Sequence, residues 1–464
     1  MTQVEALAIL KTGGNVFLTG EPGSGKTHLV NQYVAYLRSH GIEPAITAST
    51  GIAATHIGGL TIHSWSGIGI RRDLTKYDLD HLGQNRNVVR RVGKARVLII
   101  DEVSMLSART LSMIELVTRA LRRREEPFGG LQVILVGDFF QLPPVDRRET
   151  RSTVSFGQDL ISEQFAFGSR AWTALNPIVG YLSEQHRQED AMFLDLLSAI
   201  RRNVIGESHR QLLRTRYAPK PKDGITQLYS HNVDVDQINN AELAKLPGQS
   251  KTFEMTSHGA EKMVLALKRG CLSPEILALK VGARVMFTKN DVMRHQYSNG
   301  TLGVVTRFDK ENGRSVIKTN SGKMIFAEPD DWQVEDNGRV LAQISQVPLR
   351  LAWAMTVHKS QGLSLETAHL DLSRTFEYGQ GYVALSRLRT LAGLSLAGLN
   401  QRALEVHPEI LAKDADFRAQ SDQARVAFAK IPASELRTMQ TNFLRACGDK
   451  PGAGRVNIQR KRNG

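Results

Sequence analysis

A glycine-rich segment near the amino terminus has the residue types and the spacing of a phosphate-binding loop. It reads GEPGSGKT over residues 20–27 and follows a short apolar stretch at 15–19. Glycines let consecutive backbone N–H groups surround a phosphate, and the helix that follows adds its positive amino-terminal end. We expect Lys26 to contact the β- and γ-phosphates of a nucleoside triphosphate, and the Thr27 hydroxyl to complete the shell of a magnesium ion. The residues assigned to nucleotide binding are Gly20, Gly23, Ser24, Gly25, Lys26, Thr27 and His28.

Two later segments place acidic and amide side chains directly after apolar stretches. The stretch at 97–100 ends in Asp101-Glu102, where Asp101 is expected to hold magnesium and Glu102 to orient or deprotonate the attacking water. The stretch at 133–136 leads into GDFFQLPP, whose Gln141 is expected to sense the γ-phosphate. Alone, each segment would be an ordinary glycine turn, a strand with solvated acids or a polar loop. Their order in one chain favours the catalytic interpretation.

Two arginines in the expected second α/β unit indicate that the site is composite. Arg187 lies in LSEQHRQ and Arg387 lies in YVALSR. An arginine brought across a cleft onto the γ-phosphate stabilises the charge of the transition state and is worth roughly 10³–10⁵ in rate. Each arginine, taken alone, would fit a surface ion pair equally well.

Candidates for nucleic-acid contact follow strands in both halves of the chain. Small hydroxyl groups, backbone amides and a lysine suit backbone phosphates, which position a strand without reading its sequence. These candidates are Thr50, Gly51, Thr61, His63, Ser64, His358, Lys359 and Ser360. Trp65 and Phe128 could stack on a base, and Trp65 fits a packing role equally well.

The charge of the chain favours a polyanionic partner. Lys and Arg number 60 against 46 Asp and Glu, for a formal net charge of +14. Such an excess is typical of nucleic-acid binding, although a generally basic surface would give the same count. Cys271 and Cys447 lie far apart, and we find neither a signal pattern nor an apolar run of membrane-spanning length. We therefore expect a cytoplasmic, nucleoid-associated bacterial protein with no membrane partner.

The pattern of apolar stretches predicts an α/β fold with two units. Strands are expected at 16–19, 44–47, 97–100 and 133–136, each continuously apolar as in a parallel sheet that is covered on both faces. A second unit is expected to begin near 166, with a strand at 225–230 entering a helix at 233–246. Asn-Gly and Ser-Gly pairs between 284 and 346 predict hairpins of a small antiparallel barrel. The tail at 401–464 is expected to start helical and to end in a mobile basic segment.

Taken in order, these segments resemble superfamily 1B DNA helicases of the Pif-one (petite integration frequency) family. The segments that carry the resemblance, across about residues 3–400, are GEPGSGKT, TASTGIAA, GGLTIHSW, LIIDEVSM, VGDFFQLPPV, LSEQHRQ, LYSHNVDVDQIN, VHKSQG and YVALSR. Residues 111–132, which end in PFGGLQ, look like the signature insert of that family. RecD-type relatives share the ATPase motifs but are less expected to carry this insert.

The resemblance implies two RecA-like P-loop domains with ATP between them, a small wedge insertion in the first and an SH3-like β-barrel inserted in the second. The implied boundaries are 1–165 for the first domain with its wedge at about 66–91, 166–283 and 347–400 for the second domain, 284–346 for the barrel, and 401–464 for an extension. It also implies 5′ to 3′ translocation on single-stranded DNA by a monomer, with unwinding of forked duplexes, G-quadruplexes and DNA–RNA hybrids.

By matching position, the resemblance assigns residues to ATP and to DNA. Those assigned to ATP and magnesium are Lys26, Thr27, Asp101, Glu102, Gln141, Arg187 and Arg387, and those assigned to DNA are His63, Ser64, His358, Lys359 and Ser360. Gln3 corresponds to the glutamine that reads adenine, and Gly362 is expected at the nucleotide. The same motifs also fit a single-stranded-DNA-stimulated ATPase or translocase that remodels protein–DNA complexes without separating strands. A passive DNA-binding adaptor on an inactive scaffold is disfavoured by the intact catalytic residues.

Overall fold

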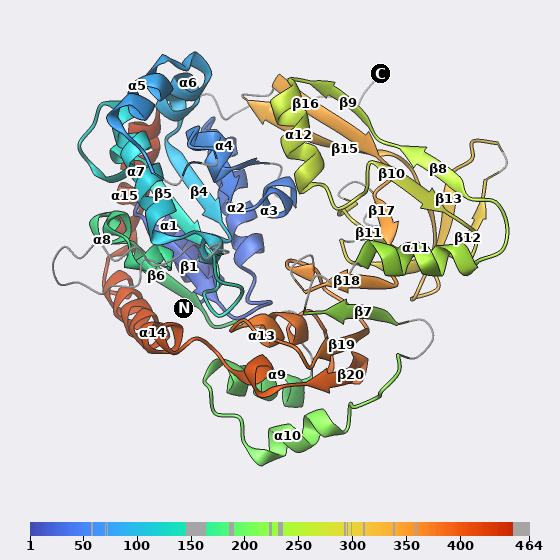
Figure 1. The fold of residues 1–464 in the computed structure, drawn as a ribbon. Coiled ribbons are helices and arrows are strands. Elements are labelled where there is room, and N and C mark those ends of the chain that lie inside the picture. Colours follow the sequence, from blue (N-terminus) through green and yellow to red (C-terminus); the bar gives the residue numbers. More distant parts are fainter. Residues whose placement is uncertain are drawn as a thin grey trace, which may run out of the picture.

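The chain folds around two parallel sheets (Figure 1). An antiparallel region is inserted into the sequence of the second unit and lies beside its sheet. This computed structural model describes residues 1–56, 59–69, 71, 73–144, 164–184, 190–221, 225–230, 235–291, 294, 296–297, 299–309, 311–336, 339–357 and 360–448.

The first unit is built on a six-stranded parallel sheet with the order β3-β2-β4-β5-β1-β6. Its strands are β1 (Val16–Gly20), β2 (Ala45–Ala48), β3 (Leu60–Thr61), β4 (Val97–Asp101), β5 (Gln132–Val136) and β6 (Ile178–Leu182). Strands β1 and β5 are buried at every position, as the continuous apolar stretches predicted. The four expected strands at 16–19, 44–47, 97–100 and 133–136 are confirmed to within one residue at each end.

Helices cover both faces of this sheet. They are α1 (Gln3–Leu10), α2 (Lys26–Ser39), α3 (Gly51–His56), α4 (Ile62–Ser66), α5 (Lys76–Gln84), α6 (Arg86–Lys94), α7 (Ala108–Arg122) and α8 (Arg170–Leu175). Helices α5 and α6 occupy most of the segment that was expected to be an insertion, and they lie together at one end of the unit (Figure 1). Thr75 and Asn85 cap their amino termini, while Leu82 and Val88 are buried in the core of the first unit.

The second unit is built on a four-stranded parallel sheet with the order β18-β7-β19-β20. Its strands are β7 (Thr226–Tyr229), β18 (Ala354–Thr356), β19 (Ala368–Leu372) and β20 (Leu394–Leu399), and its helices are α9 (Ala191–Arg201), α10 (Glu207–Arg214), α11 (Val235–Lys245) and α13 (Gln380–Leu385). Strands β7 and β18 are neighbours in space, so everything between α11 and β18 is inserted into this unit.

The insertion is antiparallel and larger than the sequence indicated. It contains α12 (Glu261–Gly270) and the strands β8 (Lys251–Glu254), β9 (Thr256–Gly259), β10 (Ile276–Leu279), β11 (Arg284–Phe287), β12 (Leu302–Phe308), β13 (Ser315–Thr319), β14 (Met324–Ala327), β15 (Asp330–Asp336), β16 (Arg339–Gln346) and β17 (Leu349–Leu351). Positive φ at Gly300, Gly313 and Gly322 supports turns at the expected Gly positions. Strand β9 pairs with β16, so the antiparallel region begins before residue 284. These early strands were not predicted, because β8 has four residues with one apolar side chain and β9 is exposed at every position.

The carboxyl-terminal helices pack mainly against the first unit. Helices α14 (Pro408–Ala429) and α15 (Ala433–Cys447) run back along β6 and α1 (Figure 1). The Phe417 ring lies 5.0 Å from the Phe17 ring, and the Ser421 hydroxyl accepts a hydrogen bond from the backbone N–H of Tyr181 at 3.0 Å. The basic end of the tail lies outside the described residues. Of the helices that are described, none has the length and apolar character needed to cross a bilayer.

Candidate active site

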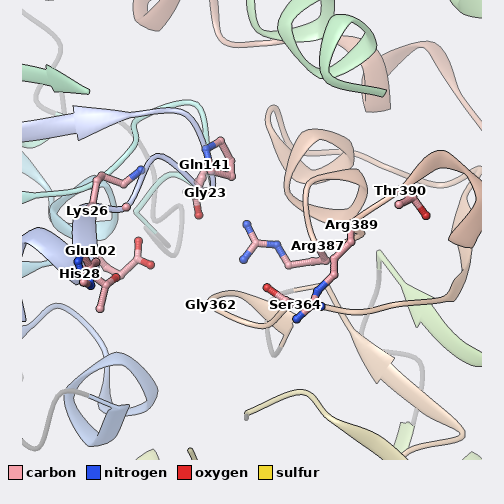
Figure 2. Close-up of a pocket in the computed structure, with 13 residues that line it drawn as sticks. Gly23, Lys26, His28, Glu102, Gln141, Gly362, Ser364, Arg387, Arg389 and Thr390 are labelled. Atoms are coloured by element: carbon pink, nitrogen blue, oxygen red, sulfur yellow. The ribbon is translucent and has the colours of Figure 1, made fainter. Parts of the chain in front are cut away.

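A cavity of about 580 Å³ lies between the two parallel units and is lined by both. Figure 2 shows side chains from the first unit facing side chains from the second across this space. The first unit contributes Gly23, Lys26, Thr27, His28, Glu102 and Gln141, and the second contributes Gly362, Ser364, Arg387, Arg389 and Thr390. The site is therefore composite, as the positions of the motifs in two halves of the chain predicted.

The loop between β1 and α2 has a backbone that glycine makes possible. Gly20, Gly23 and Gly25 all have positive φ, at 143°, 90° and 83°. A Cβ atom at Gly25 would lie 2.2 Å from the Gln3 amide nitrogen, and that amide donates a hydrogen bond to the carbonyl oxygen of Ser24 at 3.3 Å. Gln3 thus lies directly on the loop, and its contact with the base of the nucleotide stays a prediction.

Lys26 is held inside the same loop at the start of α2. Its ammonium group donates to the carbonyl oxygens of Gly20 at 2.8 Å and Glu21 at 3.0 Å. Helix α2 begins after Gly25, which has no side chain to cap it, so its first backbone N–H groups face the loop. A cation and a helix amino terminus at one point make an anion site.

Two acidic residues end strand β4 at the edge of the cavity. Glu102 adopts a left-handed backbone with φ of 52°, which costs a non-glycine residue roughly 1–2 kcal/mol and is typical of functional sites. The Asp101 carboxylate accepts a hydrogen bond from the Glu102 backbone N–H at 2.9 Å and so holds this bend. The bend aims Glu102 into the cavity (Figure 2).

The two acids titrate unusually because they are buried together. Burial raises the pKa of Asp101 above its ordinary value, against the attraction of Lys26. For Glu102, burial and the nearby Asp101 carboxylate raise the pKa to about 7, while Arg387 and Lys26 oppose the shift. A carboxylate with a pKa near neutrality can take a proton from a water molecule at physiological pH.

Arg387 reaches the cavity from the end of α13. Only 2% of its surface is exposed, its Nε donates to the carbonyl oxygen of Val383 at 3.0 Å, and its Nη2 donates to the Ser386 hydroxyl at 3.0 Å. These bonds hold the guanidinium so that it points toward the first unit (Figure 2). Arg187, His358 and Lys359 lie outside the described residues, and their assigned roles stay predictions.

Gln361 is a functional candidate to which the sequence had assigned no role. It follows β18, and its amide nitrogen lies 3.3 Å from Glu102 Oε2 and 3.4 Å from Gln141 Oε1. Gln361 thus links the second unit to both reactive side chains of the first. It belongs to VHKSQG and directly follows three residues that are predicted to contact DNA, so this motif pointed to a ligand other than the nucleotide.

The residues proposed to contact DNA lie at the amino ends of short helices of the first unit. The Thr50 and Thr61 hydroxyls cap α3 and α4, accepting from Ala53 N and Ser64 N at 3.2 Å each. Gly51 packs against α12, where an added Cβ would lie 3.0 Å from Gly270 Cα. Burial lowers the pKa of His63, so its ring is neutral at pH 7. In the second unit, Ser360 is buried and donates to the Val357 carbonyl oxygen at 2.7 Å.

Trp65 and Phe128 are core residues in this structure. Trp65 is 3% exposed and Phe128 is fully buried, both within the main apolar cluster of the first unit. Phe128 lies in a tight turn at Pro127–Gly130, whose Gly129 carbonyl oxygen accepts a hydrogen bond from Arg122 Nε at 2.7 Å. A base could reach neither ring without displacing the core. The structure therefore favours packing over base stacking for both residues.

Comparison with known proteins gives one family. The model of the family described as PIF1-like helicase matches residues 1–209. The ATP-dependent DNA helicase Pif1 of Psychrobacter is 40% identical over 506 aligned residues, which cover 97% of this chain and 75% of that protein. A crystal structure of Bacteroides Pif1 with ADP-AlF4 has a TM-score of 0.78 and 29% identity, covering 90% of this chain and 96% of that one. Bacteroides Pif1 with ADP-AlF3 and single-stranded DNA has a TM-score of 0.62 and 30% identity, covering 91% and 97%.

Proposed function

This chain belongs to the PIF1-like helicase family, and on that premise we propose that it is an ATP-dependent DNA helicase. We propose that it moves 5′ to 3′ along single-stranded DNA as a monomer and separates the strands of forked duplexes, with G-quadruplexes and DNA–RNA hybrids among its substrates. The observation that carries the proposal is the composite cavity, in which Lys26, Glu102 and Gln141 of one unit face Arg387 of the other.

The composite cavity suits ATP because each part of the nucleotide has a complementary group. The P-loop amides and Lys26 would hold the phosphates, and Gln3 would contact the base. Thr27 lies in the first turn of α2 and Asp101 ends β4, and their hydroxyl and carboxylate oxygens are hard ligands of the kind that would hold magnesium beside the phosphates. Bound there, the ion would neutralise phosphate charge.

The two units contribute different catalytic side chains to ATP hydrolysis. Glu102 accepts a proton from the attacking water, because its raised pKa makes it a stronger base than an exposed glutamate. Arg387 stabilises the negative charge of the transition state from the opposite side. Since Gln141 and Arg387 belong to different units, full catalysis requires the cleft to close, and closure can thereby be coupled to the grip on DNA.

Closure would shift the two DNA-binding surfaces relative to each other. The proposed first surface includes Thr50, Thr61 and Ser64. The proposed second surface includes Lys359 and Ser360. We propose that the first unit and the second unit are RecA-like domains and that α5 and α6 form the wedge. We also propose that the antiparallel insertion, which includes residues 284–346, contains an SH3-like barrel that steers the duplex. Alternating grip by the two surfaces converts closure into movement along the strand.

A tailed-fork unwinding assay tests the proposal directly. Two forked duplexes of the same sequence would carry single-stranded tails with either a 5′ or a 3′ end. We expect ATP-dependent strand separation of the 5′-tailed fork only. Lys26→Ala should abolish hydrolysis and unwinding but retain single-stranded DNA binding, because the proposed DNA contacts lie outside the phosphate-binding loop. Lys11→Ala, in the first unit but away from the cavity, is the matched control and should behave as wild type.

The same assay separates the helicase from its alternatives. Robust DNA-stimulated ATP turnover without strand separation would identify a translocase that remodels protein–DNA complexes. Unwinding of the 3′-tailed fork alone would overturn the proposed polarity. Equal unwinding by Lys26→Ala would overturn the assignment of the phosphate-binding loop.

A further inference from the structure

Arg201, the last residue of α9, is a buried cation that contacts four other parts of the chain. Only 1% of its surface is exposed, although α9 begins on the surface. Its guanidinium contacts Asp138 after β5, Tyr382 in α13, and Asp414 in α14, and it donates a further hydrogen bond to Tyr181 in β6. No motif in the sequence indicates a role for Arg201 or for α14.

The first contact ties Arg201 to the loop that carries Gln141. Arg201 Nη1 donates to Asp138 Oδ1 at 2.8 Å, and the guanidinium lies over the Phe140 ring at 4.0 Å from its centroid. Asp138 in turn shapes the loop, because its Oδ1 accepts from Phe140 N at 3.2 Å and its backbone carbonyl accepts from Gln141 N at 3.0 Å. A displacement of Arg201 would therefore move the Gln141 side of the cleft.

The second contact ties Arg201 to the helix that carries Arg387. Arg201 Nη1 donates to the Tyr382 hydroxyl at 3.2 Å. Tyr382 and Val383 are adjacent in α13, and the Val383 carbonyl oxygen holds Arg387 Nε at 3.0 Å. The start of α13 also touches the Gln141 loop, since an added Cβ at Gly379 would lie 2.8 Å from the Gln141 carbonyl oxygen. One guanidinium thus joins the two sides of the cleft.

The third contact brings in the carboxyl-terminal helix α14. Arg201 Nη2 lies 3.5 Å from Asp414 Oδ1, and Arg418 Nε donates to Asp414 Oδ2 at 2.7 Å. Both arginines also donate to the Tyr181 hydroxyl. From the same helix, the Phe417 ring stacks at 6.1 Å on Phe139, which directly follows Asp138. Helix α14 therefore holds the Gln141 loop through an ionic network and through an aromatic contact.

The network is charged but not fully satisfied. Within the described part of the chain, Arg201 Nε and Asp138 Oδ2 are buried without a hydrogen-bond partner. Burial alone would disfavour the Arg201 cation, yet Asp138 and the tyrosine hydroxyls raise its pKa well above the ordinary value. The cation consequently stays charged at every working pH, and the network can respond to the nucleotide only by a change of geometry. Because Arg201 Nε and Asp138 Oδ2 have no partner among the described residues in this geometry, they can form new hydrogen bonds in a second one.

We propose that Arg201 is a positioning residue that couples closure of the nucleotide cleft to the grip on DNA, and that α14 is a working part of this coupling. The proposal rests on the proposed function, since it requires the cleft to bind ATP. Helix α14 (residues 408–429) would then be part of the ATP-driven machinery. It would hold the Gln141 loop in place while α13 moves together with Arg387. Coupling of this kind is carried by charge networks with more than one arrangement.

The test uses the full chain with Asp414→Asn, Arg201→Lys and the matched control Asp422→Asn. Asp422 pairs at 3.7 Å with Arg425 on the exposed face of the same helix. The readouts are kcat and KM for ATP with and without single-stranded DNA, and the ratio of single-stranded DNA affinities measured with ADP-AlF4 and with ADP. The melting temperature of each variant is recorded beside them.

For Asp414→Asn we expect ATP KM and DNA-free kcat within about twofold of wild type, because P-loop binding is untouched. Stimulation of ATP turnover by DNA should fall at least about tenfold, because the Gln141 loop and α13 lose a shared contact. The ratio of DNA affinities should move toward one, because nucleotide binding and DNA binding are linked by one coupling free energy. Arg201→Lys should show the same pattern more strongly, since lysine lacks the fork that engages several acceptors at once. Asp422→Asn should match wild type.

Two results would overturn the inference. One is an Asp414→Asn variant with a lowered melting temperature but with wild-type DNA stimulation and a wild-type affinity ratio, which would make the network purely structural. The other is an equal loss in Asp422→Asn, which would make it an unspecific effect of α14. Should Arg201→Lys fail to fold, Asp414→Asn alone decides. Failure of the proposed function looks different, because the wild type itself would then lack DNA-stimulated ATP turnover.

Discussion

The Gln361 amide nitrogen lies 3.3 Å from the Glu102 carboxylate, so the second unit contacts the proposed general base of the first unit directly. Gln361 also lies 3.4 Å from Gln141 Oε1. Closure of the cleft cannot leave Glu102 undisturbed, because one of its hydrogen-bond partners belongs to the unit that moves. Gln361 consequently makes the orientation of the base depend on the position of the second unit.

Replacing Gln361 should slow hydrolysis without blocking nucleotide binding. A hydrogen bond to a charged group contributes roughly 1.5–3 kcal/mol, which corresponds to about 10- to 100-fold in rate if it orients the base in the transition state. We expect Gln361→Ala to lower DNA-stimulated kcat by that factor at a similar ATP KM, measured by steady-state phosphate release. Gln343→Ala removes a comparable amide pair with Gln333 far from the cleft and should leave kcat unchanged. A wild-type kcat in Gln361→Ala would contradict this role.

Arg387 should be needed for the chemical step more than for binding. It approaches from α13, whereas the phosphate-binding loop belongs to the first unit. We expect Arg387→Ala to lower kcat by about 10³ or more, while the affinity for ATP, measured by fluorescence titration without DNA, changes only a few-fold. Arg307→Ala, which removes a cation at an exposed position of β12, is the matched control. A normal kcat in Arg387→Ala would show that the second unit does not complete the site.

Trp65 should matter for stability rather than for base stacking. Truncation of a large buried aromatic side chain typically costs about 3–5 kcal/mol. We therefore expect Trp65→Ala to lower the free energy of unfolding by about that amount, as measured by urea denaturation. At a temperature where the variant stays folded, its affinity for single-stranded DNA should remain within about threefold of wild type, since stacking would contribute roughly 1–3 kcal/mol per base. A large loss of affinity for single-stranded DNA in the folded Trp65→Ala variant would instead support stacking of Trp65 on a base.

His369 should make the fold sensitive to acid. Burial lowers the pKa of His369, although Asp371 opposes the shift, and its Nδ1 lies 2.8 Å from the Ser395 hydroxyl. The unfolded chain binds a proton at about pH 6.5, whereas the folded chain binds it only at lower pH. The stabilising contribution is therefore complete above about pH 6.5 and is lost as the pH falls toward the folded pKa.

The melting temperature, measured between about pH 7.5 and 5.5, checks this effect across the range in which histidine titrates. We expect His369→Gln to be less stable than wild type at the upper end and to lose less stability on acidification. His258→Gln, on the exposed strand β9, controls for the loss of a histidine. Parallel pH profiles for wild type and His369→Gln would contradict a neutral His369 in the folded chain.

The sequence alone predicted those parts of the site whose conformation depends on residues close to them in the chain. Gly25 needs a positive φ, and Asp101 ends an apolar strand, so both are visible within a few residues of sequence. Because the carboxyl ends of parallel strands meet at one edge of a sheet, Lys26, Glu102 and Gln141 could be expected in one place. Their gathering around one cavity confirms that reasoning.

The parts that sequence did not predict depend on contacts between distant segments. Arg201 and Asp414 are separated by 213 positions, and no spacing rule relates them. Helix α14 carries Phe417 and Asp414 on a face whose partners become known only when the helix is placed against β6. Strands β8 and β9 were not predicted because each has only four residues, too few to show the repeated apolar alternation that marks a half-buried strand.

The central claim is that nucleotide in the composite cleft controls how tightly the chain holds DNA. The most direct test is the dissociation constant for a labelled single-stranded oligonucleotide, measured with ADP and with ADP-AlF4 in wild type and in Arg387→Ala. We expect the wild-type constant to differ between the two nucleotides by about tenfold or more, and the difference to disappear in Arg387→Ala, because that side chain closes the cleft around the phosphates. Equal affinities in both nucleotide states of the wild type would contradict the account.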